Sequence, residues 1–108
     1  MGPPGSGADV VRAYLRAQNL EQLGRFDEAI VLYERAVASG FDATGPYDRL
    51  IALYADRAAH REVVRIADLA LVNVRTHEDK REWYRGVRAR ARQAAADVPQ
   101  AAPKPPRE

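Results

Sequence analysis

The sequence contains few side chains that could act as nucleophiles or general bases. Its 108 residues include no cysteine, two histidines, His60 and His77, and two serines, Ser6 and Ser39. Neither serine has the sequence context of the strained strand-to-helix turn that exposes a hydrolase nucleophile. Catalysis needs a nucleophile, a base and a group that orients them. Because these residues do not supply such a set, we expect a protein that is not an enzyme.

The two histidines are also poorly placed for a metal site. In helical bundles a di-metal centre uses glutamate and histidine pairs three residues apart. Neither His60 nor His77 follows a glutamate at this spacing, and a thiolate zinc site is excluded because cysteine is absent. We therefore expect no metal ion and no cofactor, and we interpret His60 as a half-buried structural residue.

Arginine is the charged residue that dominates the C-terminal part of the sequence. The chain carries 17 basic and 15 acidic residues, and the basic excess falls in residues 77–96. Clustered arginines on one helix face are typical of a surface that binds nucleic acid. Four of them would lie within about 60° of one another on a helical wheel. These four are Arg81, Arg85, Arg88 and Arg92.

An apolar stripe lies opposite these arginines on the same wheel. It contains Trp83, Val87, Ala91 and Ala94. One apolar face and one solvated face are what a helix at the end of a helical array needs to cover its neighbour and meet water. The pattern therefore favours a capping helix, with Trp83 packed on the helix before it, over a helix that binds nucleic acid.

The apolar pattern that predicts the helices, which must position any site, recurs along the sequence at a fixed spacing. A shift of the sequence that places Gly24 over Ala58 also places Ala36 over Ala70, and it superposes further apolar positions at helical spacing. Gly24 is expected to take the left-handed conformation that ends a helix. Ala58 stands in its place in the second copy, so we expect a longer or strained connection there.

This period of about 34 residues and its helix-turn-helix pattern resemble the tetratricopeptide repeat. The first copy starts at Val10, and its compared positions are Ala13, Arg16, Ala17, Leu20, Ala29, Tyr33 and Ala36. The second copy starts at Thr44, and its compared positions are Tyr47, Leu50, Ile51, Tyr54, Val63, Ala67 and Ala70. Ala13 and Arg16 depart from the bulky residue and the leucine of the family pattern, and Phe41 and Arg75 replace its usual proline.

The resemblance implies an all-α fold, in which two tetratricopeptide-like repeats are closed by a C-terminal capping helix. Caps, glycines and apolar spacing place helices at about residues 9–23, 26–39, 46–57 and 60–74, with a fifth that ends near residue 96. Asp9 would cap the first helix and Thr76 the fifth. Residues 1–7 are expected to form a flexible leader, residues 8–96 the helical domain, and residues 97–108 a disordered, proline-rich tail.

The resemblance also implies where a partner would bind. In tetratricopeptide domains an extended peptide or a partner helix lies on the concave face made by the first helix of each repeat. Carried over by position, the lining is Val11, Tyr14, Gln18 and Gln22 in the first copy and Asp48, Ala52 and Asp56 in the second, with Arg49 as the nearby cation. Tyr14 and Gln18 replace the lysine and asparagine with which one subset of the family grips a C-terminal carboxylate, so that clamp is not expected.

The sequence therefore predicts a non-catalytic module that binds a protein or peptide partner on the concave face. The first alternative is a structural piece that self-associates, for example as a homodimer. Val11 and Leu15 point away from the helix face that the second helix covers. With Tyr14 they would contact a second molecule of the same chain. The second alternative is an RNA-associated adaptor that uses the arginine-rich helix. No stretch is apolar over the length of a membrane span, so we expect a cytoplasmic protein without a membrane contact.

Overall fold

The computed structural model describes residues 7–97, and the five elements in this range are all α-helices. They are α1 (Gly7–Gln22), α2 (Phe26–Ala38), α3 (Thr44–Asp56), α4 (His60–Asn73) and α5 (Glu78–Asp97). The predicted all-helical class is confirmed, and the helix ends agree with prediction to about two residues. Gly7 and Asp97 belong to helices rather than to the predicted leader and tail, whose other residues lie outside the described range.

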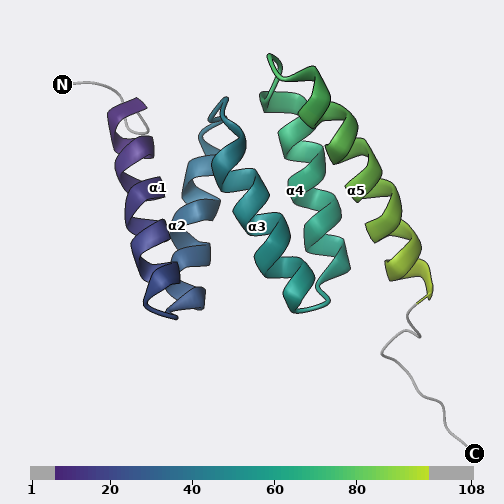
Figure 1. The fold of residues 1–108 in the computed structure, drawn as a ribbon, viewed down its shortest axis with the longest axis horizontal. Helices are drawn as coiled ribbons and strands as arrows, with labels where there is room; N and C mark the ends of the chain where they lie inside the picture. The colour runs from purple at the N-terminus through teal and green to yellow at the C-terminus, as the bar shows by residue number, and fades with distance from the viewer. Residues whose placement is uncertain (1–6, 98–108) are drawn as a thin grey trace, which may run out of the picture.

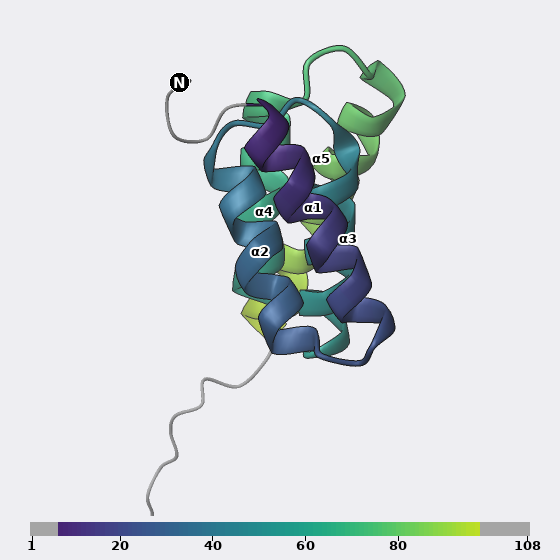
Figure 2. The same cartoon turned by 90° about the vertical axis from the view of Figure 1, so that its left-hand side faces the viewer.

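Successive helices pack side by side in alternating directions (Figure 1). The extensive contacts join α1 with α2, α2 with α3, α3 with α4, and α4 with α5. Seen from the α1 side, α1 and α3 lie on one side and α2 and α4 on the other (Figure 2). The chain thus forms two helical hairpins, followed by a single helix that covers α4.

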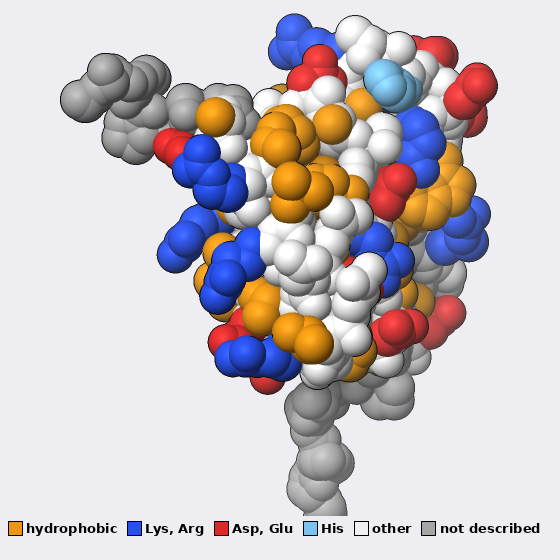
Figure 3. All heavy atoms as spheres, turned by 60° about the vertical axis from the view of Figure 1, so that its left-hand side comes forward, with side chains coloured by type: hydrophobic (Ala, Val, Ile, Leu, Met, Phe, Trp, Pro, Cys, Tyr) orange, Lys and Arg blue, Asp and Glu red, His pale blue; other side chains and the backbone are white. Residues whose placement is uncertain are grey.

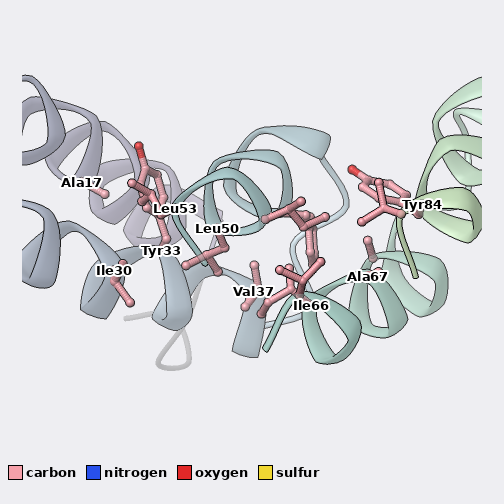
Figure 4. Close-up of a cluster of buried hydrophobic side chains, with 14 of the residues drawn as sticks. Ala17, Ile30, Tyr33, Val37, Leu50, Leu53, Ile66, Ala67 and Tyr84 are labelled. Carbon is pink, nitrogen blue, oxygen red and sulfur yellow. The ribbon is translucent and has the colours of Figure 1, made fainter. Parts of the chain in front are cut away.

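The core lies between these helices, and buried side chains from each of the five helices form one hydrophobic cluster (Figure 4). Its largest fully buried members include Tyr33, Tyr47, Leu50, Ile66 and Tyr84. Three alanines at the compared repeat positions are also buried, namely Ala29, Ala36 and Ala70. The buried residues of α2, α3 and α4 follow the period of a helix that packs on one face.

The two hairpins share the same turn, one repeat period apart. Gly24 has a φ of +78° and Ala58 a φ of +55°, which places both in the left-handed region. In each turn the amide of the following residue, Arg25 or Ala59, donates to a carbonyl five residues back, at 2.9 Å. This is the hydrogen bond of a Schellman motif, which satisfies carbonyls at a helix end. The predicted conformation of Gly24 is confirmed. Of the two possibilities expected at Ala58, a longer or a strained connection, the structure has a connection of the same geometry with Ala58 at a positive φ.

The position of Arg16 explains why the first hairpin has a charged residue where the second has leucine. Arg16 is exposed, whereas the residues one and two repeat periods later, Leu50 and Tyr84, are fully buried. Both of the buried residues lie on helices that follow another helix of the core. Within the described residues no helix precedes α1, so a leucine at position 16 would meet solvent.

The inward face of α5 begins with Tyr84, and the prediction for Trp83 is wrong. Tyr84 is fully buried, whereas Trp83 is 40% exposed. Tyr84, Val87 and Ala91 follow one another in steps of three and four residues, so they line one side of a helix as well as the predicted stripe does. The hydroxyl of Tyr84 donates to Oδ1 of Asp48 on α3 at 2.9 Å, which satisfies the polar end of this buried ring.

The arginine stripe of α5 is not a uniformly solvated face, contrary to the prediction. The guanidinium of Arg81 donates to two backbone carbonyls at the C-terminal end of α4, at 2.6 and 2.9 Å. Arg88 donates to Oδ1 of Asp68 on α4 at 3.0 Å. Arg85 and Arg92 are exposed. Half of the stripe therefore attaches α5 to α4, and Arg81 places its charge at the negative end of the α4 dipole.

Two predicted helix caps are corrected by the structure. Helix α1 begins at Gly7, so Asp9 lies inside the first turn, where a negative charge still favours the helix dipole. Helix α5 begins at Glu78, and the hydroxyl of Thr76 lies 3.0 Å from Nδ1 of His77 instead of accepting from the first turn. Side-chain hydroxyls near helix ends have several local partners, which a sequence pattern alone does not distinguish.

Candidate interaction surface

A recess of about 310 Å³ opens where α1, α2 and α3 meet. We call it the first recess, and its lining consists of Gln18, Glu21, Gln22, Phe26, Tyr33 and Arg49. Its position follows from the turn at Gly24, which brings the end of α1 and the start of α2 together beside α3. The phenyl ring of Phe26 at the start of α2 is 44% exposed, so it offers an apolar surface beside the polar groups.

The floor of the first recess holds a paired charge. Glu21 accepts hydrogen bonds from the hydroxyl of Tyr33 at 2.7 Å and from Nε of Arg49 at 3.1 Å, and a second nitrogen of Arg49 also donates to it. The Arg49 hydrogen bond holds the pKa of Glu21 below its ordinary value of 4.5. Burial, together with the hydrogen bond to Glu21, raises the pKa of Tyr33. Because Glu21 comes from α1 and Arg49 from α3, their ion pair ties the two hairpins together.

Several predicted binding residues lie in or beside this recess. Gln18, Gln22 and Arg49 line it directly. Tyr14 lies one turn before Gln18, and the amide of Gln18 donates to the Tyr14 hydroxyl at 3.2 Å. The Tyr14 ring packs closely on Gly45 of α3, where an added Cβ would lie 2.3 Å from the hydroxyl oxygen. Tyr14 thus occupies the space that a side chain at position 45 would fill.

The predicted residues of α3 are in different surroundings. Asp48 accepts from Tyr84 and forms an ion pair with Lys80 of α5 at 2.9 Å, so its carboxylate joins α3 to α5. Ala52 is half-buried, and Asp56 is exposed at the end of α3. Neither of these two lines the first recess. The structure therefore groups Gln18 and Gln22 of α1 with Arg49 and separates them from the rest of the predicted α3 face.

The remaining two predicted residues, Val11 and Leu15, form an exposed apolar strip on α1. They are 43% and 52% exposed, while Val10 and Ala17 on the neighbouring face of the same helix are buried. The expectation that α2 covers one face of α1 and leaves Val11 and Leu15 outside is confirmed. Figure 3 shows the side of the molecule on which α1 lies, where hydrophobic side chains reach the surface among charged ones.

Three residues that line the first recess were not predicted as binding residues from the sequence, namely Glu21, Phe26 and Tyr33. Glu21 lies three residues after Gln18, so helical spacing alone places it on the face that carries Gln18. Phe26 follows the turn at Gly24, and its contact with the end of α1 could have been inferred from the tight connection. Tyr33 belongs to the buried stripe of α2, and helical periodicity does not indicate that its hydroxyl reaches α1.

The part of the chain from residue 7 to residue 97 contains no cluster of three or more potential metal-ligating side chains. Within the same range no helix has the length and apolar character needed to cross a membrane. No protein-family model, curated protein or solved structure matches this sequence.

Proposed function

We propose that this chain is a non-catalytic interaction module of the tetratricopeptide type, which binds a peptide on the surface formed by α1 and α3. The observation that carries this proposal is the recurrence of one helix–turn–helix geometry at a period of about 34 residues, which is typical of that family. Helices α3 and α5 also begin one repeat period apart, at Thr44 and Glu78. These two helices thus recur in register, and the first helices of the repeats form the binding face in tetratricopeptide domains.

The first recess has the chemistry that an extended peptide requires. A peptide backbone offers unpaired N–H and C=O groups, and the amides of Gln18 and Gln22 can both donate and accept. The exposed ring of Phe26 supplies apolar contact beside them. The ion pair between Glu21 and Arg49 holds these two side chains in place, so they lose little conformational freedom when a ligand binds.

A random-peptide display selection against the full chain tests this proposal. Selected peptides are expected to bind in solution, and the double substitution Gln18→Ala with Gln22→Ala is expected to weaken binding about tenfold, the loss typical of one or two hydrogen bonds. Gln93→Ala on α5 is the matched control, since its amide pairs with Asp97 away from the recess. A selection that enriches no binding peptide, or peptides that bind the double variant unchanged, would contradict the proposal.

Self-association is a second candidate function, and the exposed strip of Val11 and Leu15 favours it. Burying two aliphatic side chains against a second copy would contribute favourable free energy in proportion to the area removed from water. Sedimentation velocity over a wide range of protein concentration measures this directly. Leu15→Glu is expected to abolish any dimer, whereas Val72→Glu, at another exposed aliphatic residue on α4, is the control. A wild-type protein that stays monomeric throughout would remove this candidate.

The contacts of α5 favour peptide binding over the RNA-associated alternative. Arg81 and Arg88 are engaged with α4, and Arg85 lies 2.8 Å from Glu82. Arginines that already have partners release fewer counterions from a phosphate backbone, which is the main source of affinity for nucleic acid. Binding of an RNA homopolymer that falls steeply with added salt would reverse this preference.

A further inference from the structure

A second recess, also of about 310 Å³, opens where α3, α4 and α5 meet. Its lining consists of Ile51, Ala55, His60, Val63, Val87, Arg90, Ala91 and Ala94. We call it the second recess. Ile51, Val63, Val87 and Ala91 are core residues whose surfaces form its walls, so most of its lining is aliphatic. The polar groups are those of His60 and Arg90.

The two recesses occupy related places in the two hairpins, and their charges differ. A shift of one repeat period takes Glu21 and Phe26 of the first recess to Ala55 and His60 of the second. In the first recess the carboxylate of Glu21 neutralises Arg49. In the second recess no lining residue is acidic, because alanine replaces the glutamate at position 55.

Arg90 is therefore a cation at the edge of an apolar recess, and no residue that lines this recess offers a carboxylate to Arg90. Its side chain is exposed, and it forms no ion pair within residues 7–97, whereas Arg81, Arg85 and Arg88 of the same helix all do. One of its guanidinium nitrogens lies along α5, about 3.3 Å from the place of a Cβ on Gly86. A guanidinium next to an apolar wall is suited to a bidentate carboxylate, since the wall excludes water from one side of the pair.

We propose that the second recess binds a segment of a partner protein that carries an aliphatic side chain beside a carboxylate. The aliphatic group would lie among Ile51, Val63 and Val87, and the carboxylate would pair with Arg90. This inference rests on the proposed function, because it names the partner chemistry of an interaction module. The ligand supplies at Arg90 the negative charge that Glu21 supplies at Arg49.

The charge of the recess favours this occupant over two others. A second copy would offer the exposed strip of Val11 and Leu15, but that strip is accompanied by the exposed cation Arg16, which would repel Arg90. The chain's own residues 98–108 carry two basic residues and one acidic residue, Glu108, so they match the recess poorly. An acidic and aliphatic peptide segment complements both the wall and the cation.

Three labelled peptides test the proposal by fluorescence anisotropy with the full chain. The first probe has a central leucine flanked by glutamates, the second has glutamines in place of the glutamates, and the third has alanine in place of the leucine. The first probe is expected to bind saturably with one site per chain. The other two are expected to bind about tenfold more weakly, because each lacks one of the two interactions that the recess provides.

Two substitutions test whether the first probe binds in the second recess. Arg90→Glu is expected to weaken the first probe at least about tenfold and to create binding of a leucine peptide flanked by lysines. Ala55→Glu gives the second recess the carboxylate of the first, so it is expected to pair with Arg90 and to exclude the acidic probe. Arg92→Glu is the control, since Arg92 is exposed on the same helix and does not line the recess. Thermal melts of each variant confirm that the fold is intact.

Several outcomes would overturn the inference. If peptides from the display selection bind and depend on Gln18 and Gln22, while the acidic probe does not bind or is insensitive to Arg90→Glu, the inference fails and the proposed function stands. If neither the selection nor the probe yields binding, both fail. A dimer that Arg90→Glu dissociates would assign the recess to a second copy. A gain in probe affinity on Glu108→Lys would assign it to the chain's own C-terminal residues.

Discussion

Ala58 takes the backbone conformation of Gly24 at the equivalent point of the second hairpin, with a φ of +55° against +78°. For a residue with a Cβ this left-handed conformation costs about 1–2 kcal/mol, whereas glycine adopts it freely. The second turn therefore keeps the geometry of the first although its sequence does not favour it. Packing of α3 against α4 must hold Ala58 in place.

Ala58→Gly is accordingly expected to stabilise the fold by about 1 kcal/mol, since relief of strain exceeds the added chain entropy. Urea denaturation at neutral pH measures the change in the free energy of unfolding. Ala89→Gly is the control, because Ala89 is exposed inside α5, and glycine there should destabilise by about 0.5–1 kcal/mol. If both substitutions destabilise, Ala58 is not strained in the folded chain.

The reverse change in the first turn gives an independent prediction. Nothing lies within 4 Å of a Cβ built on Gly24, so Gly24→Ala introduces backbone strain without a clash. It is expected to lower the free energy of unfolding by about 1 kcal/mol, because the strain is partly offset by the smaller entropy of the unfolded chain. Thermal unfolding followed by circular dichroism measures the loss, and an unchanged melting temperature would contradict it.

The burial of Tyr84 and the exposure of Trp83 predict opposite results for two neighbouring substitutions. Tyr84→Ala removes a fully buried ring and its hydrogen bond to Asp48, so it should destabilise by about 3–5 kcal/mol. Trp83→Ala should cost about 1 kcal/mol, since the indole is partly exposed and contacts Lys80 through a cation–π interaction at 4.0 Å. Urea denaturation of both variants makes the comparison. Equal losses would show that Trp83 shares the packing of α5 on α4.

Most of the fold could be predicted from the sequence because its signals are local. Gly24 and Gly40 end α1 and α2, and both have positive φ, as helix-ending glycines do. Helical periodicity alone allows either Trp83 or Tyr84 to lead the inward stripe of α5. The repeat period distinguishes them, because Tyr84 lies one period after the fully buried Leu50, whereas Trp83 lies one period after the partly exposed Arg49.

Substitutions at Arg16 and Leu50 test whether the face of α1 that carries Arg16 is exposed to solvent. Arg16→Leu should change the free energy of unfolding by less than about 0.5 kcal/mol, because position 16 is exposed. Leu50→Arg should unfold the chain or destabilise it severely, since it places an unpaired charge at a fully buried position. Urea denaturation, supported by circular dichroism for the second variant, measures both. A marked stabilisation by Arg16→Leu would show that this face of α1 is covered.

The lowered pKa of Glu21 predicts that the folded chain loses stability in acid. Its pKa is lowered in the folded chain, chiefly by the hydrogen bond from Arg49, so its contribution is complete above its ordinary pKa of 4.5. That contribution is lost as the pH falls through the lowered value. Glu21→Gln should therefore lose less stability than wild type between neutral pH and about pH 3. Urea denaturation at several pH values measures the difference.

Glu28→Gln is the control for the acid prediction. Glu28 pairs with Arg25 one turn away on the exposed surface, and such pairs contribute little to stability. Parallel pH profiles for wild type and Glu21→Gln would show that the ion pair between Glu21 and Arg49 does not stabilise the folded chain.

The candidate site was less predictable than the fold, and the ion pair of Glu21 with Arg49 explains why. The two residues are 28 positions apart and come from helices of different hairpins. Whether they meet depends on how closely α1 approaches α3, which the small residue Gly45 and the ring of Tyr14 determine. Sequence spacing identified the exposed face of each helix. It did not identify which side chains of the two faces bond to each other.

The sequential packing of the helices has a consequence for how the chain folds. Extensive contacts join each helix to its neighbour along the sequence, so few distant segments must meet before native contacts form. Chains with such low contact order fold in microseconds to milliseconds. Among the described residues α1 has extensive contacts with α2 alone, whereas α3 has them with both α2 and α4, so amide protons of α1 should exchange with solvent faster than those of α3. The α1 surface that we propose as a binding face would then be less protected than the middle of the fold, and a bound ligand would slow its exchange.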